Sequence, residues 1–377
     1  MIRSFKIRLK PTKEQEELMI KSCGVMRWSY NYGLKRKIDH YDEFKTNLPL
    51  NIIRKEIQIM KKTENFKWIS DVSSKVYDES LRDLEKAFKN FFNEDKGFPK
   101  FKSKKRSKLS FYVRSEHLWF KGDLVNFEKI GKIKFSSNYN FPQGHKVCKF
   151  TNPRCIFDGK YWYLGFGMNV DEKQVDLNQD LSIGIDLGLK ELAICSNGLR
   201  FKNINKTYKM MRLEKKLKRF QRRCSRKYEM NKQGNSFVKT RNIIKLERKI
   251  KLIYRRIKNI RMNHIHQTTR KIINKKPYKI VMEDLKVSNM VKNRHLAKAI
   301  YEQLWYEFRR QIQYKGEEFG IKFILAKWNY ASSQICSGCG AINRSMKDLR
   351  KRTYKCEHCG LEIDRDLNAS INLSKLD

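Results

Sequence analysis

Four of the nine cysteines stand in two Cys-x-x-Cys pairs near the C-terminal end of the sequence, with sixteen residues between the pairs and a glycine after each pair. The pairs are Cys336 with Cys339 and Cys356 with Cys359. Four thiolates in two tight turns can enclose one Zn²⁺ and leave no ligand position open for a substrate, which is typical of a structural site. His358, inside the second turn, is a weaker candidate ligand. The pattern therefore predicts a zinc ribbon over residues 335–360.

The other five cysteines are scattered along the chain, and the total is odd. Because no signal-peptide pattern follows Met1, we expect a reducing compartment and no disulfide framework. The scattered thiols are then packing residues: Cys23, Cys148, Cys155, Cys195 and Cys224. We expect a cytoplasmic, nucleoid-associated protein, and a nuclear location stays open if the host is eukaryotic.

Lysine and arginine number 84 against 40 aspartate and glutamate residues, which gives a formal net charge of +44 over 377 residues. A compact body with this excess repels itself unless a polyanion accompanies it. The sequence contains no apolar run of about 20 residues, so we expect no membrane partner. Hydrophobic residues make up 40% of the chain, which is too many for a disordered protein. Nucleic acid is therefore the expected partner.

Residues 206–276 concentrate this charge, with 26 lysines and arginines against three acids. Apolar residues recur there at three- and four-residue steps, first from Met210 and again from Leu246, which predicts two long helices joined near Gly234. Like charges four residues apart destabilise a free helix, so this surface is predicted to face phosphates.

The remaining chain changes its pattern twice. Alternating apolar and polar residues predict a short strand at residues 2–10, and Thr12 begins a mainly helical segment. From about Leu109 the chain turns to short strands separated by glycines, as in residues 130–135 and a hairpin at 157–165. Many short strands predict a small β-barrel that opens with residues 2–10 and carries the helical segment as an insertion.

Acidic residues end two apolar strands and begin a final helix. They are Asp186 at the end of strand 181–188, Glu283 and Asp284 at the end of strand 278–285, and Asp364 and Asp366 at the start of the helix. Each alone is explained by a turn, a solvated strand end or a helix cap. Together they can converge at one sheet edge, where they repel one another unless Mg²⁺ or Mn²⁺ binds. Two such ions can stabilise the attacking and leaving oxygens of a phosphodiester, so the sequence predicts a metal-dependent enzyme acting on nucleic acid.

Several motifs stand in a specific order along nearly the whole chain. They are Arg8-Leu-Lys-Pro-Thr12, Gly97-Phe-Pro-Lys-Phe-Lys102, Gly184-Ile-Asp186-Leu-Gly188, Glu283-Asp-Leu285, Ser332-Ser333, the two cysteine pairs and Asp364-Arg-Asp366-x-Asn368. This ordered set resembles TnpB, the transposon-encoded RNA-guided nuclease related to type V CRISPR effectors. No motif alone is decisive, but their order is specific.

The resemblance implies an α+β multidomain fold with a RuvC-type, RNase H-like nuclease domain and a β-barrel wedge domain. Its parts are the first barrel strand (1–10), a helical recognition domain (11–108), the rest of the barrel (109–180), the nuclease domain (181–334) with basic helices 206–276, the zinc ribbon (335–360) and the C-terminal nuclease helix (361–377). The zinc ribbon is thus inserted just before the last helix of the nuclease domain.

The resemblance also implies the site and the activity. Asp186, Glu283 and Asp366 would bind the catalytic Mg²⁺ or Mn²⁺ ions. Asp364 would either cap the helix or support the metal-binding acids from behind, and Asp284 would not be catalytic. A guide RNA from the transposon end would direct the cleavage of double-stranded DNA beside a short adjacent motif, by two-metal-ion hydrolysis. We expect a monomer in that complex.

Three alternatives share much of this chemistry. A guided DNA-binding protein without cleavage would not need all three acids. A transposase that joins DNA ends also uses three carboxylates on an RNase H-like fold, but this chain has no separate end-binding domain. A miniature CRISPR effector would differ in its genomic neighbourhood, because it would lie beside a CRISPR array rather than at a transposon end.

Overall fold

The computed structural model describes residues 2–94, 96–104, 107–145, 147–171, 175–327, 329–348 and 350–377. The chain divides into two compact units, residues 1–170 and 171–377. Among the described residues, none of the helices combines the length and apolar character that a membrane crossing requires.

The first unit is built on a sheet of seven described strands in the order β2-β6-β7-β1-β5-β4-β3. The strands are β1 (Ile2–Lys10), β2 (Ser110–Tyr112), β3 (Trp119–Lys121), β4 (Leu124–Phe127), β5 (Gly131–Ser136), β6 (Phe150–Phe157) and β7 (Trp162–Asn169). β1 lies inside the sheet, antiparallel to both β7 and β5. In the described pairings β2 and β3 remain edges, so the sheet is a half-barrel rather than a closed barrel.

Three helices follow β1 and precede β2, so the helical segment is an insertion between strands of one sheet. They are α1 (Lys13–Phe44), α2 (Leu50–Met60) and α3 (Ser74–Asn93). α1 begins where predicted, because the Thr12 hydroxyl accepts a hydrogen bond from the Gln15 amide and the Gln15 side chain accepts one from the Thr12 amide. This reciprocal pair satisfies two amides that the first helical turn leaves free.

The second unit contains a mixed sheet in the order β10-β9-β8-β13-β14. Its strands are β8 (Asn178–Leu187), β9 (Glu191–Cys195), β10 (Arg200–Lys202), β13 (Pro277–Glu283) and β14 (Lys322–Ala326). β8 and β9 form the predicted antiparallel hairpin, whereas β8, β13 and β14 run parallel. β8 begins at Asn178, three residues before the apolar run predicted as a strand from residue 181, and the second compact unit is residues 171–377.

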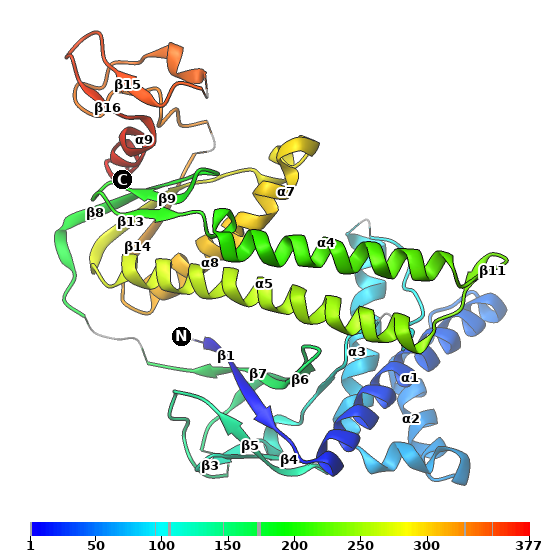
Figure 1. Cartoon of the computed structure of the whole chain (residues 1–377). Coiled ribbons are helices and arrows are strands. Elements are labelled where there is room, and N and C mark those ends of the chain that lie inside the picture. Colours follow the sequence, from blue (N-terminus) through cyan, green and yellow to red (C-terminus); the bar gives the residue numbers. More distant parts are fainter. Residues whose placement is uncertain are drawn as a thin grey trace. The chain divides into compact units, whose positions relative to one another are not determined.

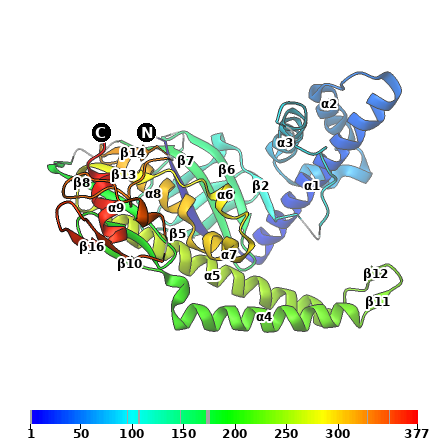
Figure 2. The same cartoon turned by 90° about the horizontal axis from the view of Figure 1, so that it is seen from above.

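The basic segment forms two long antiparallel helices, α4 (Tyr208–Glu229) and α5 (Arg241–Ile273), which lie side by side in both views (Figures 1 and 2). A short hairpin of β11 (Lys232–Gln233) and β12 (Ser236–Phe237) joins them, and Gly234 takes the positive φ of 55° in its turn. The prediction of two helices joined near Gly234 is confirmed. We call this pair the basic hairpin.

The remaining elements of the second unit complete its core and its C-terminal part. They are α6 (Val287–Met290), α7 (Arg294–Gln303), α8 (Trp305–Glu317), β15 (Thr353–Lys355), β16 (Glu362–Asp364) and α9 (Arg365–Ser374). α8 packs against α5, and α9 packs against β8. The β15–β16 pair belongs to the cysteine ribbon, and α9 follows it directly (Figure 1).

Gly184 of β8 lies directly beneath α9. A Cβ atom at this position would stand 1.9 Å from the carbonyl oxygen of Ser370 and 2.5 Å from the amide nitrogen of Ser374. Both atoms belong to the helix backbone, so a rotamer change cannot relieve the collision. A residue without a Cβ is therefore required for α9 to reach the sheet.

We expect Gly184→Ala to destabilise the second unit by about 3 kcal/mol or more, beyond ordinary overpacking, because backbone atoms must move. Gly316→Ala is the matched control, since its Cβ would meet nothing closer than 3.6 Å and alanine favours the helix. Urea unfolding followed by circular dichroism measures both. Equal unfolding midpoints for the two variants would contradict the close contact.

Candidate active site and metal centre

Asp186 and Glu283 lie at the same edge of the five-stranded sheet. β8 and β13 run parallel with Ile185 opposite Met282, so the next residue of each strand is an acid. Residues in register on parallel strands point to the same face. The two carboxyl groups, which are 97 residues apart in the sequence, are thereby brought together in a partly buried position.

The first turn of α9 supplies the third predicted acid. The carboxylate of Asp364 caps this helix, because it accepts hydrogen bonds from the amides of Asp366 at 3.1 Å and Leu367 at 3.0 Å. This confirms the capping role predicted for Asp364. Asp366 lies within the capped turn, and its side chain is 25% exposed.

The three carboxyl groups perturb one another. Burial raises the pKa of Asp186 well above its ordinary value, and the carboxylates of Glu283 and Asp366 raise it further. Burial also raises the pKa of Glu283 and that of Asp366. Three ionised carboxylates in this position repel one another, and oxygen donors are those that Mg²⁺ and Mn²⁺ prefer. The donor chemistry of the three acids therefore fits the cations that the sequence predicts. Among the described residues, the ligand atoms that all lie within 4.8 Å of one another are those of the four ribbon cysteines and not those of the three acids.

Arginines that sequence reasoning missed surround these acids. Arg352 lies 3.6 Å from the carboxylate of Asp366, and Arg200 lies 3.4 Å from that of Asp364. Arg365 is buried, and its charge lowers the pKa of Asp186 and of Glu283. Arg365 stands within the Asp364-Arg-Asp366 motif, whereas no sequence signal distinguishes Arg200 and Arg352 among the 84 basic residues.

The acid next to Glu283 has a different environment. Asp284 forms an ion pair with Arg309 of α8 at 2.7 Å, and its side chain is 43% exposed. Glu283 instead accepts a hydrogen bond from the hydroxyl of Ser332. Glu283 is the last residue of β13 and Asp284 follows it directly, and these neighbouring acids have different partners.

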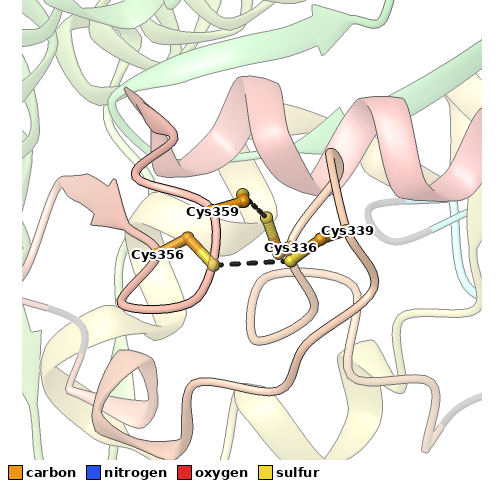
Figure 3. A group of neighbouring side chains, drawn as sticks. All are labelled: Cys336, Cys339, Cys356 and Cys359. Carbon is orange, nitrogen blue, oxygen red and sulfur yellow. Dashed lines mark hydrogen bonds between the residues drawn. The ribbon is translucent and has the colours of Figure 1, made fainter.

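The four predicted zinc ligands come together in the ribbon, where all their sulfur atoms lie within 4.8 Å of one another. The Sγ atoms of Cys336 and Cys359 are 3.6 Å apart, as are those of Cys339 and Cys356 (Figure 3). Burial opposes ionisation of Cys336, but hydrogen bonds from the amides of Cys339 and Gly338 and from the side chains of Cys356 and Cys359 together lower its pKa to about 6. A thiolate at neutral pH is the form that binds a metal, so this donor set fits Zn²⁺.

Two of the three acids of the basic hairpin are held in ion pairs. Glu214 pairs with Arg261 at 3.1 Å and with Lys298 at 2.9 Å, and Glu247 pairs with Lys239. The outer face of α4 forms an open depression of about 570 Å³. Its lining residues include no acid: Lys218, Gln221, Arg222, Ser225 and Arg226. This face offers cations and hydrogen-bond donors to a phosphate backbone.

Three family models match the chain in the same order as the structural parts. The IS605 OrfB model, described as "Probable transposase", matches residues 166–294, and the helix-turn-helix model of the same family matches residues 1–46. The model "Cas12f1-like, TNB domain" matches residues 305–373, which include the cysteine ribbon. The chain is thus similar to the TnpB/IS605 OrfB family in three successive segments. These matches confirm the resemblance carried by the sequence motifs.

Two relatives of this family match almost the full chain, and both are named "Putative RNA-guided DNA endonuclease". The protein from Streptomyces pristinaespiralis is 28% identical, over 98% of this chain and 88% of that protein. InsQ from Escherichia coli strain K12 is 29% identical, over 99% of this chain and 91% of that protein. The similarity to these relatives therefore extends along nearly the full chain rather than over one segment.

A solved structure gives the same fold at low sequence identity. The Cas12f1 chain of a Cas12f1–sgRNA–target DNA complex aligns with a TM-score of 0.58 and 13% identity, over 99% of this chain and 98% of that one. The mixed α/β multidomain fold class predicted from the sequence is confirmed. In this chain the segment matched as a helix-turn-helix consists of strand β1 and the long helix α1.

We expect Asp186→Asn to stabilise the metal-free protein at pH 8 by about 0.5–2 kcal/mol, because it removes a buried, repelled charge. The folded state raises the pKa of Asp186, so the ionised Asp186 carboxylate destabilises the folded wild type at high pH. The stabilising effect of Asp186→Asn therefore disappears as the pH falls and the wild-type carboxyl binds a proton. Thermal unfolding between pH 5 and 8 measures the difference. Asp284→Asn, which loses an ion pair, should not stabilise the protein.

Cys336→Ser should lower the bound zinc from about one ion per chain towards none and unfold the ribbon, because three thiolates bind zinc more weakly than four. Elemental analysis of the purified protein measures the metal. Cys224→Ser, at a cysteine of α4 outside the cluster, is the control and should keep its zinc. Full zinc retention in Cys336→Ser would exclude the four-ligand site.

Proposed function

We propose that this chain is an RNA-guided DNA endonuclease that cleaves double-stranded DNA beside a short adjacent motif. The observation that carries the proposal is the convergence of three carboxyl groups, from β8, β13 and α9, at one sheet edge of a chain with 44 excess positive charges. Similarity to the family and the names of the relatives support the guided activity.

Asp186, Glu283 and Asp366 would hold the catalytic ions. Mg²⁺ or Mn²⁺, when bound there, supplies positive charge to the phosphodiester and to the attacking water. The partial burial of the three carboxyl groups limits access of bulk water, which strengthens every charge interaction at the site. Arg352 stands beside Asp366, where its exposed guanidinium can neutralise the phosphate that approaches the acids.

The basic hairpin provides the surface for the nucleic acids. Lys218, Arg222 and Arg226 lie four residues apart on α4, so they follow one face of the helix about 6 Å from one another. Cations in such a row can follow a phosphate backbone without reading its sequence. The guide RNA supplies the sequence specificity by pairing with one DNA strand. The protein therefore needs shape and charge at this surface rather than contacts to bases.

A plasmid experiment tests the proposal. The protein is co-expressed with its flanking genomic DNA, the RNA that co-purifies is sequenced, and the complex is incubated with Mg²⁺ and plasmids that carry the matching target beside randomised flanks. We expect depletion of particular flanks, and we expect Asp186→Ala to reduce cleavage at least 100-fold while it preserves RNA-dependent DNA binding. Asp284→Ala is the matched control and should cleave like the wild type.

Two results would overturn the proposal. Bound RNA with all plasmids intact would identify a guided DNA-binding protein that does not cut. The absence of any discrete RNA would instead favour a transposase or an unguided nuclease. Loss of DNA binding together with cleavage in Asp186→Ala would remove the catalytic role from this residue.

A further inference from the structure

The segment that leads into the first cysteine turn, residues 329–337, passes beside the carboxylate site. We call it the entrance segment. Ser332 within it is 3% exposed, and its hydroxyl donates a hydrogen bond to the carboxylate of Glu283. This hydrogen bond lowers the pKa of Glu283, against the effect of burial. A buried carboxylate that accepts such a bond has one oxygen fixed and the other free to bind a cation.

Two asparagines of α9 hold the entrance segment. The side-chain amide of Asn372 donates to the carbonyl of Ser332 at 2.8 Å and to that of Ile335 at 2.7 Å. Asn368 donates to Ile335 at 2.7 Å and accepts from the amide of Ser337 at 2.9 Å. Both asparagines are buried. Displacing Ser332 would leave these buried groups unpaired, at a cost of about 1–3 kcal/mol for each.

The same helix therefore places two of the three acids. Asp366 belongs to the first turn of α9, whereas Glu283 on β13 is reached from α9 through Asn372 and then Ser332. Cys336 lies within the entrance segment, so the segment also joins the zinc ribbon to the carboxylates. The position of Glu283 is thus fixed from a neighbouring part of the fold as well as from its own strand.

We propose that Ser332 is a positioning residue, which holds the Glu283 carboxylate in the orientation that binds the catalytic cation. The proposal rests on the proposed function, in which Glu283 is a cation ligand. Hydrogen bonds to metal-binding carboxylates typically change metal affinity 10- to 100-fold. Ser332 acts through Glu283 and need not touch the substrate.

The test compares Ser332→Thr with Ser332→Val in the full-length, zinc-loaded chain. The two side chains have the same shape, but threonine keeps the hydroxyl that valine lacks. Mn²⁺ is the probe, and electron paramagnetic resonance of the free ion reports how much the protein binds without any cleavage. Ser345→Ala, at an exposed serine of the ribbon, is the control.

We expect Ser332→Val to bind Mn²⁺ about 10-fold more weakly than Ser332→Thr and to need about 10-fold more Mg²⁺ for half-maximal cleavage. Zinc content and RNA-dependent target binding should equal those of the wild type in both variants. A structural role alone would alter the two variants equally, because their packing volumes match. Ser332→Ala should resemble Ser332→Val, which separates the loss of the hydroxyl from the added methyl group.

Equal Mn²⁺ binding by the threonine and valine variants, with binding lost in Asp186→Ala, would overturn the positioning role and leave the proposed function intact. Wild-type Mn²⁺ binding in Asp186→Ala would instead show that the three acids are not the cation site. The proposed function would then fail, and the role of Ser332 with it. The two failures are therefore distinguishable in one binding experiment.

Discussion

The second unit depends on a contact between backbones, in which α9 rests on β8 at Gly184. Because Gly184 has no side chain, the carbonyl oxygen of Ser370 can lie where a Cβ atom would otherwise stand. That approach places Asp366 near Asp186, two residues further along the strand. It also places Asn372 where it can hold the entrance segment. One missing Cβ atom is thus a condition for bringing the third acid, Asp366, to the two acids on the strands.

Positive and negative charges are concentrated in different parts of the second unit. Two acids of the basic hairpin are used in internal pairs, Glu214 with Arg261 and Glu247 with Lys239, so most of its cations stay available to a polyanion. The carboxylate site shows the opposite arrangement, because the buried Asp186 lies among acids that raise its pKa further. A polyanion would reduce the repulsion among the cations of the basic hairpin. Multivalent cations would reduce the repulsion among the acids of the carboxylate site.

Much of this architecture follows from local sequence patterns. The ends of parallel strands share a sheet edge, so Asp186 and Glu283 could be placed together, and spacing alone grouped the four cysteines. Asp364 was identifiable as a cap from its position before the helix. The bond between Ser332 and Glu283 was not predictable, because it joins residues 49 positions apart through the packing of a third element, α9. The start of β8 at Asn178 was missed because the predicted strand boundary followed the apolar run alone.

The position of β1 inside the first sheet has a consequence for synthesis on the ribosome. Ile7 pairs with Leu164, 157 residues later in the chain, and its own side chain is buried. At about 5–20 residues per second, this strand waits roughly 8–30 s before its partner β7 exists. During that interval its apolar face and its unpaired backbone are open to wrong partners, which is the usual route to aggregation of an early strand. The helices that follow β1 can fold locally in the meantime, so α1 is the first element able to shield Ile7 and Leu9.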